Sequence, residues 1–314
     1  GNVGRPGSGV NPLRGQSNVQ GACDMGCLPT FYTGYQRVAD QEVRARFEQA
    51  WGMALPATPG LTEPEMMEAA AKGEVSAMMI IGENPIISDA DANHVRLALE
   101  RLDFLVVQDI FLTETAQMAD VVLPAASFAE KDGTFTNTER RVQRVRQAVS
   151  SPGEARPDWW IICELGKRML RRRGESEAAF TFAEPREIAE EIAKVTPSYR
   201  GISYDRLERE SLQWPCPDAT HPGTPRLHVG QFARGLGRFV SVDHIPPAEE
   251  PDDEYPLVLT TGRSLYHFHT GSMTRRVPGL SQIVPEAAIE VNPSDAARYS
   301  LEDGETVRVV SRRG

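Results

Sequence analysis

The sequence predicts a doubly wound α/β domain followed by the first part of a β-barrel domain. Short apolar runs alternate with amphipathic segments through the middle of the chain, the pattern of parallel strands joined by crossover helices. From Tyr255 onward the pattern changes to short strand-like runs separated by turns, which indicates an all-β domain. With 314 residues and 40% hydrophobic content, the chain is long enough to form two domains or more.

The α/β pattern is clearest between residues 75 and 123. VSAMMII is a short apolar run of the kind that a buried parallel strand needs, and GENP then ends it. The predicted elements are a strand at Val75–Ile81, a helix at Asp91–Leu102, a strand at Phe104–Val107, a helix at Thr113–Met118 and a strand at Asp120–Leu123. Three strands in this order predict a Rossmann-like sheet.

The next segment, Gly133–Val149, is predicted to be extended and carries a basic ribbon of Arg140, Arg141, Arg144 and Arg146. Two interpretations stay open: a solvated hairpin face, or a cationic wall beside an anionic cofactor or a subunit. Pro157–Arg173 is predicted to be a helix, because proline and Asp158 stand at its start and arginines at its end. Pro185–Val195 is predicted to be another helix.

The last part of the chain is predicted to contain an incomplete barrel. Residues 213–254 are rich in proline and glycine and are interpreted as a covering segment and linker. The predicted elements beyond them are strands at Pro256–Thr261, Ala288–Val291 and Thr306–Ser311, with a short helix at Asn292–Ser300. The last strand has no returning partner, and Gly1 is not a start residue. We therefore expect these residues to be an interior piece of a longer polypeptide.

Composition excludes several classes of protein. The net charge of −10 argues against nucleic acid as the main partner. No apolar run approaches the roughly 20 residues that span a bilayer, so we expect no membrane span and a cytoplasmic location. Four cysteines are scattered without a CxxC pair or an iron–sulfur run, which predicts free buried thiols and no metal cluster held by this piece.

The glycine-rich opening, Gly1–Cys27, is interpreted as a binding surface. A linker would repeat serine and glycine, whereas this segment is irregular, rich in amides such as Gln16, and carries the guanidinium of Arg14 among its glycines. Glycine also lets a backbone approach a ligand closely.

Two loops follow predicted strands and are candidates for nucleotide recognition. In an open α/β sheet, ligands bind outside the carboxyl ends of the strands, and Gly82–Ser88 and Gln108–Thr113 lie there. The candidate side chains, which can pair with bases, ribose or phosphate, are Asn84, Ser88, Gln108 and Asp109. Asp158 is either a further contact or only a helix cap. No GxGxxG follows the first strand, so an ordinary NAD site is disfavoured.

A third candidate segment is Thr260–Arg276, which is rich in basic and titratable side chains. His267 and His269 alternate, so on a strand they would face the same way. A metal site stays open on that geometry, but no acidic or cysteine partner lies nearby. Binding of an anionic phosphate or a pterin suits these side chains, with Arg263, better.

Four motifs resemble one family. They are VNPLRGQSNVQGACDMG (Val10–Gly26), IIGENPIISDAD (Ile80–Asp91), the long segment Val106–Gln143, and YPLVLTTGR (Tyr255–Arg263), with the PDWWII helix start between the last two. Together they resemble the molybdopterin oxidoreductases and, within them, the catalytic subunit of metal-dependent formate dehydrogenase. The resemblance covers essentially the whole chain in order.

The resemblance implies roles for particular residues. Arg14 matches the arginine that holds the formate carboxylate beside the metal, and Gln16 matches a pterin contact. The residues that fall where the family contacts a guanine dinucleotide are Asn84, Ser88, Gln108 and Asp158. Gly82 and Asp109, in the same two loops, are further candidates for binding the cofactor. The residues that match the pterin-binding turn are Arg263, Ser264, His267 and His269. Ser264 and His269 depart from the Glu and Ser of some relatives, and Asn84 stands where some relatives have Asp.

The resemblance also implies domains, cofactors and partners. Residues 1–17 would end a cofactor-binding domain, 18–212 would be the guanine dinucleotide-binding region with an inserted extended segment at 131–149, and 255–314 would be an incomplete C-terminal dinucleotide-binding barrel. The cofactor would be bis-molybdopterin guanine dinucleotide with molybdenum or tungsten. A [4Fe-4S] cluster, the metal ligand and further electron-transfer subunits would lie outside this piece, which we expect to be inactive alone.

Three alternatives stay open at this point. A nitrate reductase shares the same pattern, a scaffold subunit of a respiratory complex keeps the fold without the pterin, and a plain dinucleotide-binding module is a third possibility. The LRGQSNVQGACDMG segment favours formate, and the retention of Arg14, Gln16, Arg263 and His267 argues against the scaffold subunit. The acidic composition favours an NAD-linked assembly.

Overall fold

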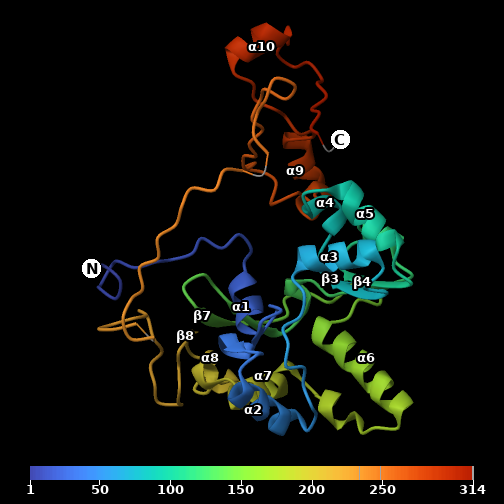
Figure 1. The fold of residues 1–314 in the computed structure, drawn as a ribbon. Helices are drawn as coiled ribbons and strands as arrows, with labels where there is room; N and C mark the ends of the chain where they lie inside the picture. The colour runs from blue at the N-terminus through green and yellow to red at the C-terminus, as the bar shows by residue number, and fades with distance from the viewer. Residues whose placement is uncertain (233, 248, 313–314) are drawn as a thin grey trace. The chain divides into compact units, whose positions relative to one another are not determined.

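A computed structural model describes residues 1–232, 234–247 and 249–312, and the chain divides into two compact units, Gly1–Leu236 and Gly237–Gly314. Figure 1 labels the elements. The strands, all in the first unit, are β1 Phe31–Tyr32, β2 Gln36–Arg37, β3 Ala77–Ile81, β4 Phe104–Asp109, β5 Val121–Pro124, β6 Gly133–Thr136, β7 Arg141–Val145 and β8 Leu212–Gln213.

The helices complete both units. Those of the first unit are α1 Val19–Asp24, α2 Gln41–Trp51, α3 Glu63–Lys72, α4 Pro85–Ser88, α5 Ala92–Glu100, α6 Asp158–Arg173, α7 Pro185–Val195 and α8 Tyr204–Leu207. Its short 3₁₀ helices are η1 Thr33–Tyr35, η2 Ala116–Met118, η3 Phe128–Glu130, η4 Glu177–Phe180 and η5 Pro197–Tyr199. The second unit has η6 Thr274–Arg276, α9 Pro278–Ile283 and α10 Pro293–Tyr299.

The first unit contains a three-stranded parallel sheet in the order β3-β4-β5. Ile80 lies opposite Val107 in its register, and Gln108 lies opposite Leu123. All three strands were predicted from the alternation of apolar runs and helices, as was α5 between the first two. The sheet therefore places the carboxyl ends of β3, β4 and β5 at one edge.

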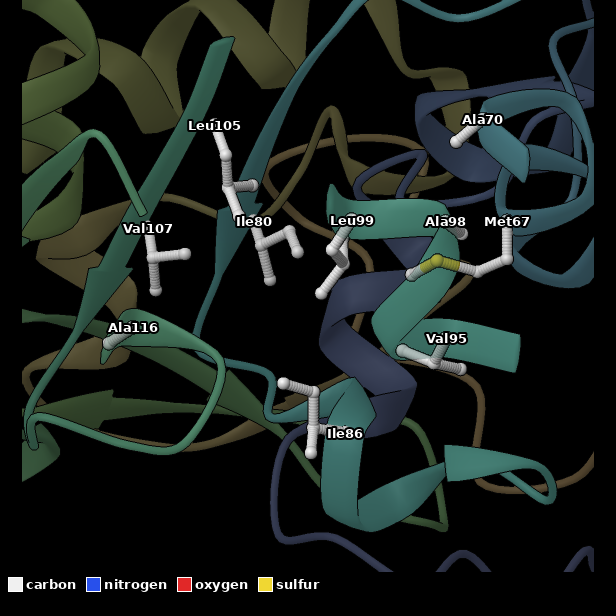
Figure 2. Close-up of a cluster of buried hydrophobic side chains, with 10 residues drawn as sticks. All are labelled: Met67, Ala70, Ile80, Ile86, Val95, Ala98, Leu99, Leu105, Val107 and Ala116. Carbon is white, nitrogen blue, oxygen red and sulfur yellow. The ribbon is translucent and has the colours of Figure 1, made fainter. Parts of the chain in front are cut away.

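The helices that connect these strands pack on one face of the sheet. Figure 2 shows the side chains of Ile80 and Val107 on the side of Leu99 of α5, and Leu105 and Ala116 of η2 belong to the same buried cluster. The strands run in sequence order, so the direction of winding does not reverse among them. On the opposite face Phe104 is 47% exposed. The prediction of a doubly wound sheet is thus confirmed only as a small parallel α/β sheet.

Helices α2 and α3 were not predicted, although the sequence contains the signals that start them. Asp40 caps α2, since its carboxylate accepts hydrogen bonds from the backbone N–H groups of Glu42 and Val43. Glu65 closes a capping box at α3, because its carboxylate accepts from both the backbone N–H and the hydroxyl of Thr62, each at 2.7 Å. By contrast, α6 and α7 match their predicted ranges.

The predicted helix at Thr113–Met118 is wrong in its first half, where only η2, Ala116–Met118, is helical. Thr113 and Thr115 are buried, and their hydroxyls accept from the N–H of Ala116 and donate to Asn84, respectively. Threonine side chains that bond locally in this way offer the backbone an alternative to a regular helix.

The basic ribbon lies on an antiparallel sheet, β6-β7-β8, as the prediction of an extended segment requires. The arginines of the ribbon bind groups of the same unit. Arg144 pairs with Glu208 at 2.9 Å and lies over the ring of Tyr204, and Arg141 pairs with Glu139. Arg140 donates to the backbone oxygens of Trp214 and Thr224. The partners are acidic side chains and carbonyl oxygens of the same unit. This favours a structural role for these arginines over a cationic wall beside a cofactor or a subunit.

The predicted barrel strands are not formed. Residues 256–261, 288–291 and 306–311 lie outside any strand, while α10 confirms the short helix predicted at 292–300. Side chains of the expected strands, such as Val258, Ile289 and Val309, are 75%, 43% and 54% exposed. Short strands need an apolar face to pack on and a partner for their backbone groups, and the described part of this unit supplies neither.

Replacing Ile80 with valine should remove one buried methylene from the core under the sheet. Ile80 is 8% exposed, whereas Ile81, the next residue of β3, is 44% exposed. We expect Ile80→Val to lower the stability of the β3–β4 region by about 0.5–1.5 kcal/mol, and Ile81→Val to change it by less than about 0.5 kcal/mol. Hydrogen exchange of the β4 amides in the full-length protein measures both. Equal effects would contradict the core described here.

Candidate functional site

The loops after β3 and β4 meet at the carboxyl edge of the parallel sheet. Gly82 follows β3 directly, and its N–H donates to the backbone oxygen of Gln108 at 2.9 Å. The backbone of Gly82 has φ +66° and nothing lies within 4 Å of the position that a Cβ would take. Glycine thus turns the chain here and leaves open space beside it.

The centre of the site is the side chain of Gln108, which is completely buried. Its Nε2 donates to Oδ1 of Asp158 at 2.7 Å, and Oδ2 of Asp158 forms an ion pair with Nζ of Lys131. The Oε1 atom of Gln108 is buried without a hydrogen-bond partner in the described structure. An unsatisfied buried acceptor is costly and needs an explanation.

A second pairing ties the loop after β3 to the loop after β4. Asn84 is 6% exposed, and its Nδ2 donates to a carboxylate oxygen of Glu114 at 2.9 Å. Its Oδ1 accepts from the hydroxyl of Thr115 at 2.7 Å and from the N–H of the same residue at 3.2 Å. The side chain of Asn84 therefore links the two loops by hydrogen bonds.

The remaining candidates of this edge make local bonds. The hydroxyl of Ser88 donates to the backbone oxygen of Asn84 at 3.1 Å and to Asp89 at 3.2 Å. The carboxylate of Asp109 accepts from the N–H of Phe111 at 3.1 Å, which shapes the loop after β4. The structure thus joins Gln108 to Asp158, and Asn84 to Ser88, around one edge.

This arrangement fits a ligand that donates hydrogen bonds from a flat ring. The unpaired oxygen of Gln108 accepts only, and the carboxylate of Asp158 adds further acceptor capacity. A guanine ring presents adjacent N–H donors on one edge. These donors match the unpaired acceptor Oε1 of Gln108 and the carboxylate of Asp158. Lys131 forms an ion pair with Asp158 and so holds that carboxylate in place beside Gln108.

The carboxyl groups of Glu63, Glu83 and Asp89 lie close enough together to affect the pKa of Glu63, so the stability of the protein should depend on pH here. Burial first, then the hydrogen bond and charge of Asp89 and the charge of Glu83, raise the pKa of Glu63 to about 7. Because this pKa lies above the unfolded value of 4.5, Glu63 favours the folded state at low pH, and that contribution is lost as pH rises through about 7. We expect Glu63→Gln to be more stable than the wild type at pH 8 and equal to it below pH 4.5.

Glu65, two residues further along α3, provides the matched control. The backbone N–H and the hydroxyl of Thr62 lower the pKa of Glu65, so its contribution is present above its unfolded pKa and is lost as pH falls. Glu65→Gln should therefore be less stable than the wild type at pH 8. The melting temperatures of both full-length variants between pH 4 and 8 measure this, and shifts of the same sign would contradict it.

The opening segment places Arg14 beside α1. Arg14 is partly buried, its Nη1 lies 3.9 Å from Sγ of Cys23, and its Nε is buried without a hydrogen-bond partner in the described structure. Gln16 is exposed. The guanidinium therefore retains unused donor capacity, as binding of a carboxylate requires.

The candidates of the second unit are less uniform than predicted. Arg263, Ser264 and His269 are exposed. His267 is 6% exposed, with Nδ1 at 3.2 Å from Oγ1 of Thr274 and Nε2 at 2.8 Å from the backbone oxygen of Val284. Both ring nitrogens of His267 thus have partners within this unit, and residues 267–269 do not form the strand on which His267 and His269 would face the same way.

The described residues show neither a metal-binding cluster nor a membrane-spanning helix. No group of three or more His, Cys, Asp or Glu side chains in the described ranges is arranged to hold a metal ion. None of the described helices has both the length and the apolar character needed to cross a membrane. The four cysteines are free thiols, of which Cys163 and Cys216 are buried, and Cys27 is exposed against the prediction.

Two charged side chains of the site were not predicted from the sequence. Lys131 and Glu114 both lie inside the long motif Val106–Gln143, but a single charged residue on a connecting segment gives no signal of its own. Lys131 is 27 residues from Asp158 in the chain, and only the fold brings them together.

Two family profiles match the chain. The molybdopterin oxidoreductase profile matches residues 1–168, and the molydopterin dinucleotide binding domain profile matches residues 257–314. The first includes every candidate of the sheet edge, and the second includes those of the second unit.

Curated relatives match the whole chain. The F420-dependent formate dehydrogenase 2 subunit alpha of Methanococcus maripaludis is 53% identical over 317 residues, which cover 100% of this chain and 46% of the relative. The F420-dependent formate dehydrogenase subunit alpha of Methanocaldococcus jannaschii is 52% identical over 316 residues, with the same shares covered. The chain thus spans about half the length of these relatives.

A solved structure shares the fold. Acetylene hydratase from Pelobacter acetylenicus aligns with a TM-score of 0.58 at 22% identity, over 84% of this chain and 38% of that chain. At this identity the likeness concerns the fold alone.

Proposed function

Because the chain belongs to the molybdopterin oxidoreductase family, we propose that it is part of the catalytic subunit of a formate dehydrogenase. The enzyme would oxidise formate to carbon dioxide at a bis-molybdopterin guanine dinucleotide centre that contains molybdenum or tungsten. The observation that carries this proposal is the 52–53% identity, over 100% of the chain, to two subunits named as formate dehydrogenase alpha. The match of residues 257–314 to a dinucleotide-binding domain supports the cofactor.

The residues of the sheet edge would hold one guanine dinucleotide. Gln108 would accept a hydrogen bond from the base through its orphaned Oε1, and Asp158 would accept from the neighbouring donor. Asn84 and Ser88 would fix the loop after β3 and Asp109 the loop after β4, while the open space beside Gly82 would admit the ligand backbone. The residues proposed for the pterin are Gln16, Arg263, Ser264, His267 and His269.

Arg14 would bind the substrate. Formate is a small carboxylate, and a guanidinium can bind it through two parallel hydrogen bonds that orient its C–H bond. Oxidation of formate releases carbon dioxide, one proton and two electrons, and the bound metal centre would supply the electron acceptor for that step. The contribution of the protein at Arg14 is to neutralise the carboxylate and to fix its direction.

The assembly around this subunit is also a proposal. A [4Fe-4S] cluster and further electron-transfer subunits would carry the electrons away, in the cytoplasm. An NAD acceptor was expected from composition, but the similarity to two subunits of F420-dependent formate dehydrogenases favours F420 as the alternative acceptor. Assays of the purified complex with NAD and with F420 separate the two.

The test uses the full-length, metal-loaded protein, assayed with formate and with nitrate. We expect formate oxidation and no nitrate reduction, together with fluorescent pterin released on oxidation. Nitrate reduction would assign the chain to another enzyme of the family. Absence of pterin would support a scaffold subunit and contradict the proposal.

A further inference from the structure

Asp24, the last residue of α1, is a fully buried carboxylate. Its Oδ2 accepts from the hydroxyl of Tyr199 at 2.5 Å and from Nε1 of Trp214 at 2.6 Å, and its Oδ1 accepts from Nε2 of Gln20 at 2.7 Å. Tyr199 and Trp214 are 175 and 190 residues away in the chain. Burying a carboxylate is costly unless it is hydrogen-bonded in this way, so the contacts tie three segments together.

The donors around Asp24 are themselves fixed. Gln20 also donates to the hydroxyl of Tyr35 at 2.9 Å, and the rings of Tyr35 and Tyr199 lie 6.1 and 6.4 Å from that of Trp214. Burial and the nearby Asp24 raise the pKa of Tyr199, and they raise that of Tyr35 to about 12. Both tyrosines therefore keep their protons at neutral pH, and Tyr199 stays a donor to Asp24.

The helix that Asp24 ends is too short to hold its own position. It has six residues, and isolated helices of that length are not stable in water. Asn18, at its start, accepts from the N–H of Thr136 at 2.9 Å. A Cβ at Gly21 would lie 2.2 Å from Oδ1 of Asn18, so only glycine allows this close approach. The position of α1 thus depends on contacts with distant segments.

Cys23 connects this anchored helix to the proposed substrate-binding group. It precedes Asp24 directly, and its sulfur lies 3.9 Å from Nη1 of Arg14. Arg14 is only partly buried, and its Nε has no partner in the described structure. The side of α1 therefore forms a support for the guanidinium, and any shift of α1 moves that support.

On this geometry, which rests on the proposed function for the role of Arg14, we propose that Asp24 is a positioning residue for formate binding. It fixes α1 through Tyr199 and Trp214, and α1 fixes the guanidinium of Arg14. Asp24 does not touch formate. Its effect on the reaction passes entirely through Arg14.

The experiment uses the full-length, metal-loaded enzyme with Asp24→Asn, Tyr199→Phe and Trp214→Phe. We expect Asp24→Asn to raise the KM for formate about tenfold, because its amide cannot accept from all three donors, and the single-donor variants to raise it severalfold. The pterin content should stay at the wild-type level. Hydrogen exchange of the α1 amides should quicken at least tenfold, while that of β3 and β4 stays unchanged.

A double-mutant cycle separates positioning from general destabilisation. In an Arg14→Lys background, Asp24→Asn should add no further loss of kcat/KM, because the group through which it acts is gone. Leu99→Ala, which disturbs the core under the sheet, is the control and should leave the KM for formate unchanged. If Asp24→Asn does not fold, Tyr199→Phe takes its place in the cycle.

Three results would overturn the inference: losses that multiply independently in the cycle, faster exchange in α1 with an unchanged KM, or unchanged exchange in α1. A wild-type enzyme that does not oxidise formate would instead reject the proposed function. The exchange data would then still decide whether Asp24 anchors α1, since unchanged exchange in α1 also overturns the inference.

Discussion

Replacing Arg14 with lysine in the full-length enzyme is expected to lower kcat/KM for formate by about 10²–10⁴-fold. The guanidinium offers two parallel donors to a carboxylate, whereas an ammonium offers a point charge without the planar fork. Hydrogen bonds to charged groups contribute about 1.5–3 kcal/mol each, and every 1.36 kcal/mol is tenfold in rate. Loss of the correct direction of the C–H bond adds to this, so kcat should fall as well as KM rise.

Steady-state kinetics with formate measure this prediction, and the pterin content confirms that the cofactor is still bound. Arg5→Lys is the matched control, since Arg5 is an exposed arginine of the same segment and should keep kcat/KM within about twofold of the wild type. Wild-type kinetics for Arg14→Lys would remove Arg14 from the substrate site.

Replacing Gln108 with leucine should weaken retention of the guanine dinucleotide by about 30-fold or more. The change removes the buried acceptor at Oε1 and leaves Oδ1 of Asp158 without its donor. A ligand donor left unpaired against the buried position of Gln108 costs about 1–3 kcal/mol, and the loss of the donor to Asp158 adds to this. Because leucine has a similar volume, the effect comes from lost hydrogen bonds and not from a cavity.

Pterin and guanosine monophosphate released per chain, after extensive dialysis of the purified full-length protein, measure this retention. Gln143→Leu is the control, because Gln143 lies exposed on β7. Equal cofactor content in Gln108→Leu and Gln143→Leu would show that the orphaned oxygen has another purpose.

The sheet could be predicted because its signals are local. The run at residues 75–81 and the helix at 91–102 carry their own periodicity, and both form as β3 and α5. Local signals also predicted the barrel strands, but these strands do not form. Runs such as PLVLTT have strand propensity, but a strand forms only where another strand accepts its hydrogen bonds and an apolar face covers it.

The position of a candidate residue could be predicted where a fold rule fixes it, and not where a long-range contact fixes it. Gln108 lies near the end of a parallel strand and Asp158 starts a helix, and the structure brings them together although they are 50 residues apart. The role of Asp24 depends on Tyr199 and Trp214, and no local pattern links residues so distant in the chain.

The most direct measurement of the central claim is a cryo-EM or crystal structure of the full-length enzyme with its cofactor bound. The account predicts a guanine ring at the carboxyl edge of β3 and β4, with one of its N–H groups within about 3 Å of Oε1 of Gln108 and a second donor facing Asp158. A guanine dinucleotide bound elsewhere, with Oε1 of Gln108 paired to a protein group or to water, would contradict it.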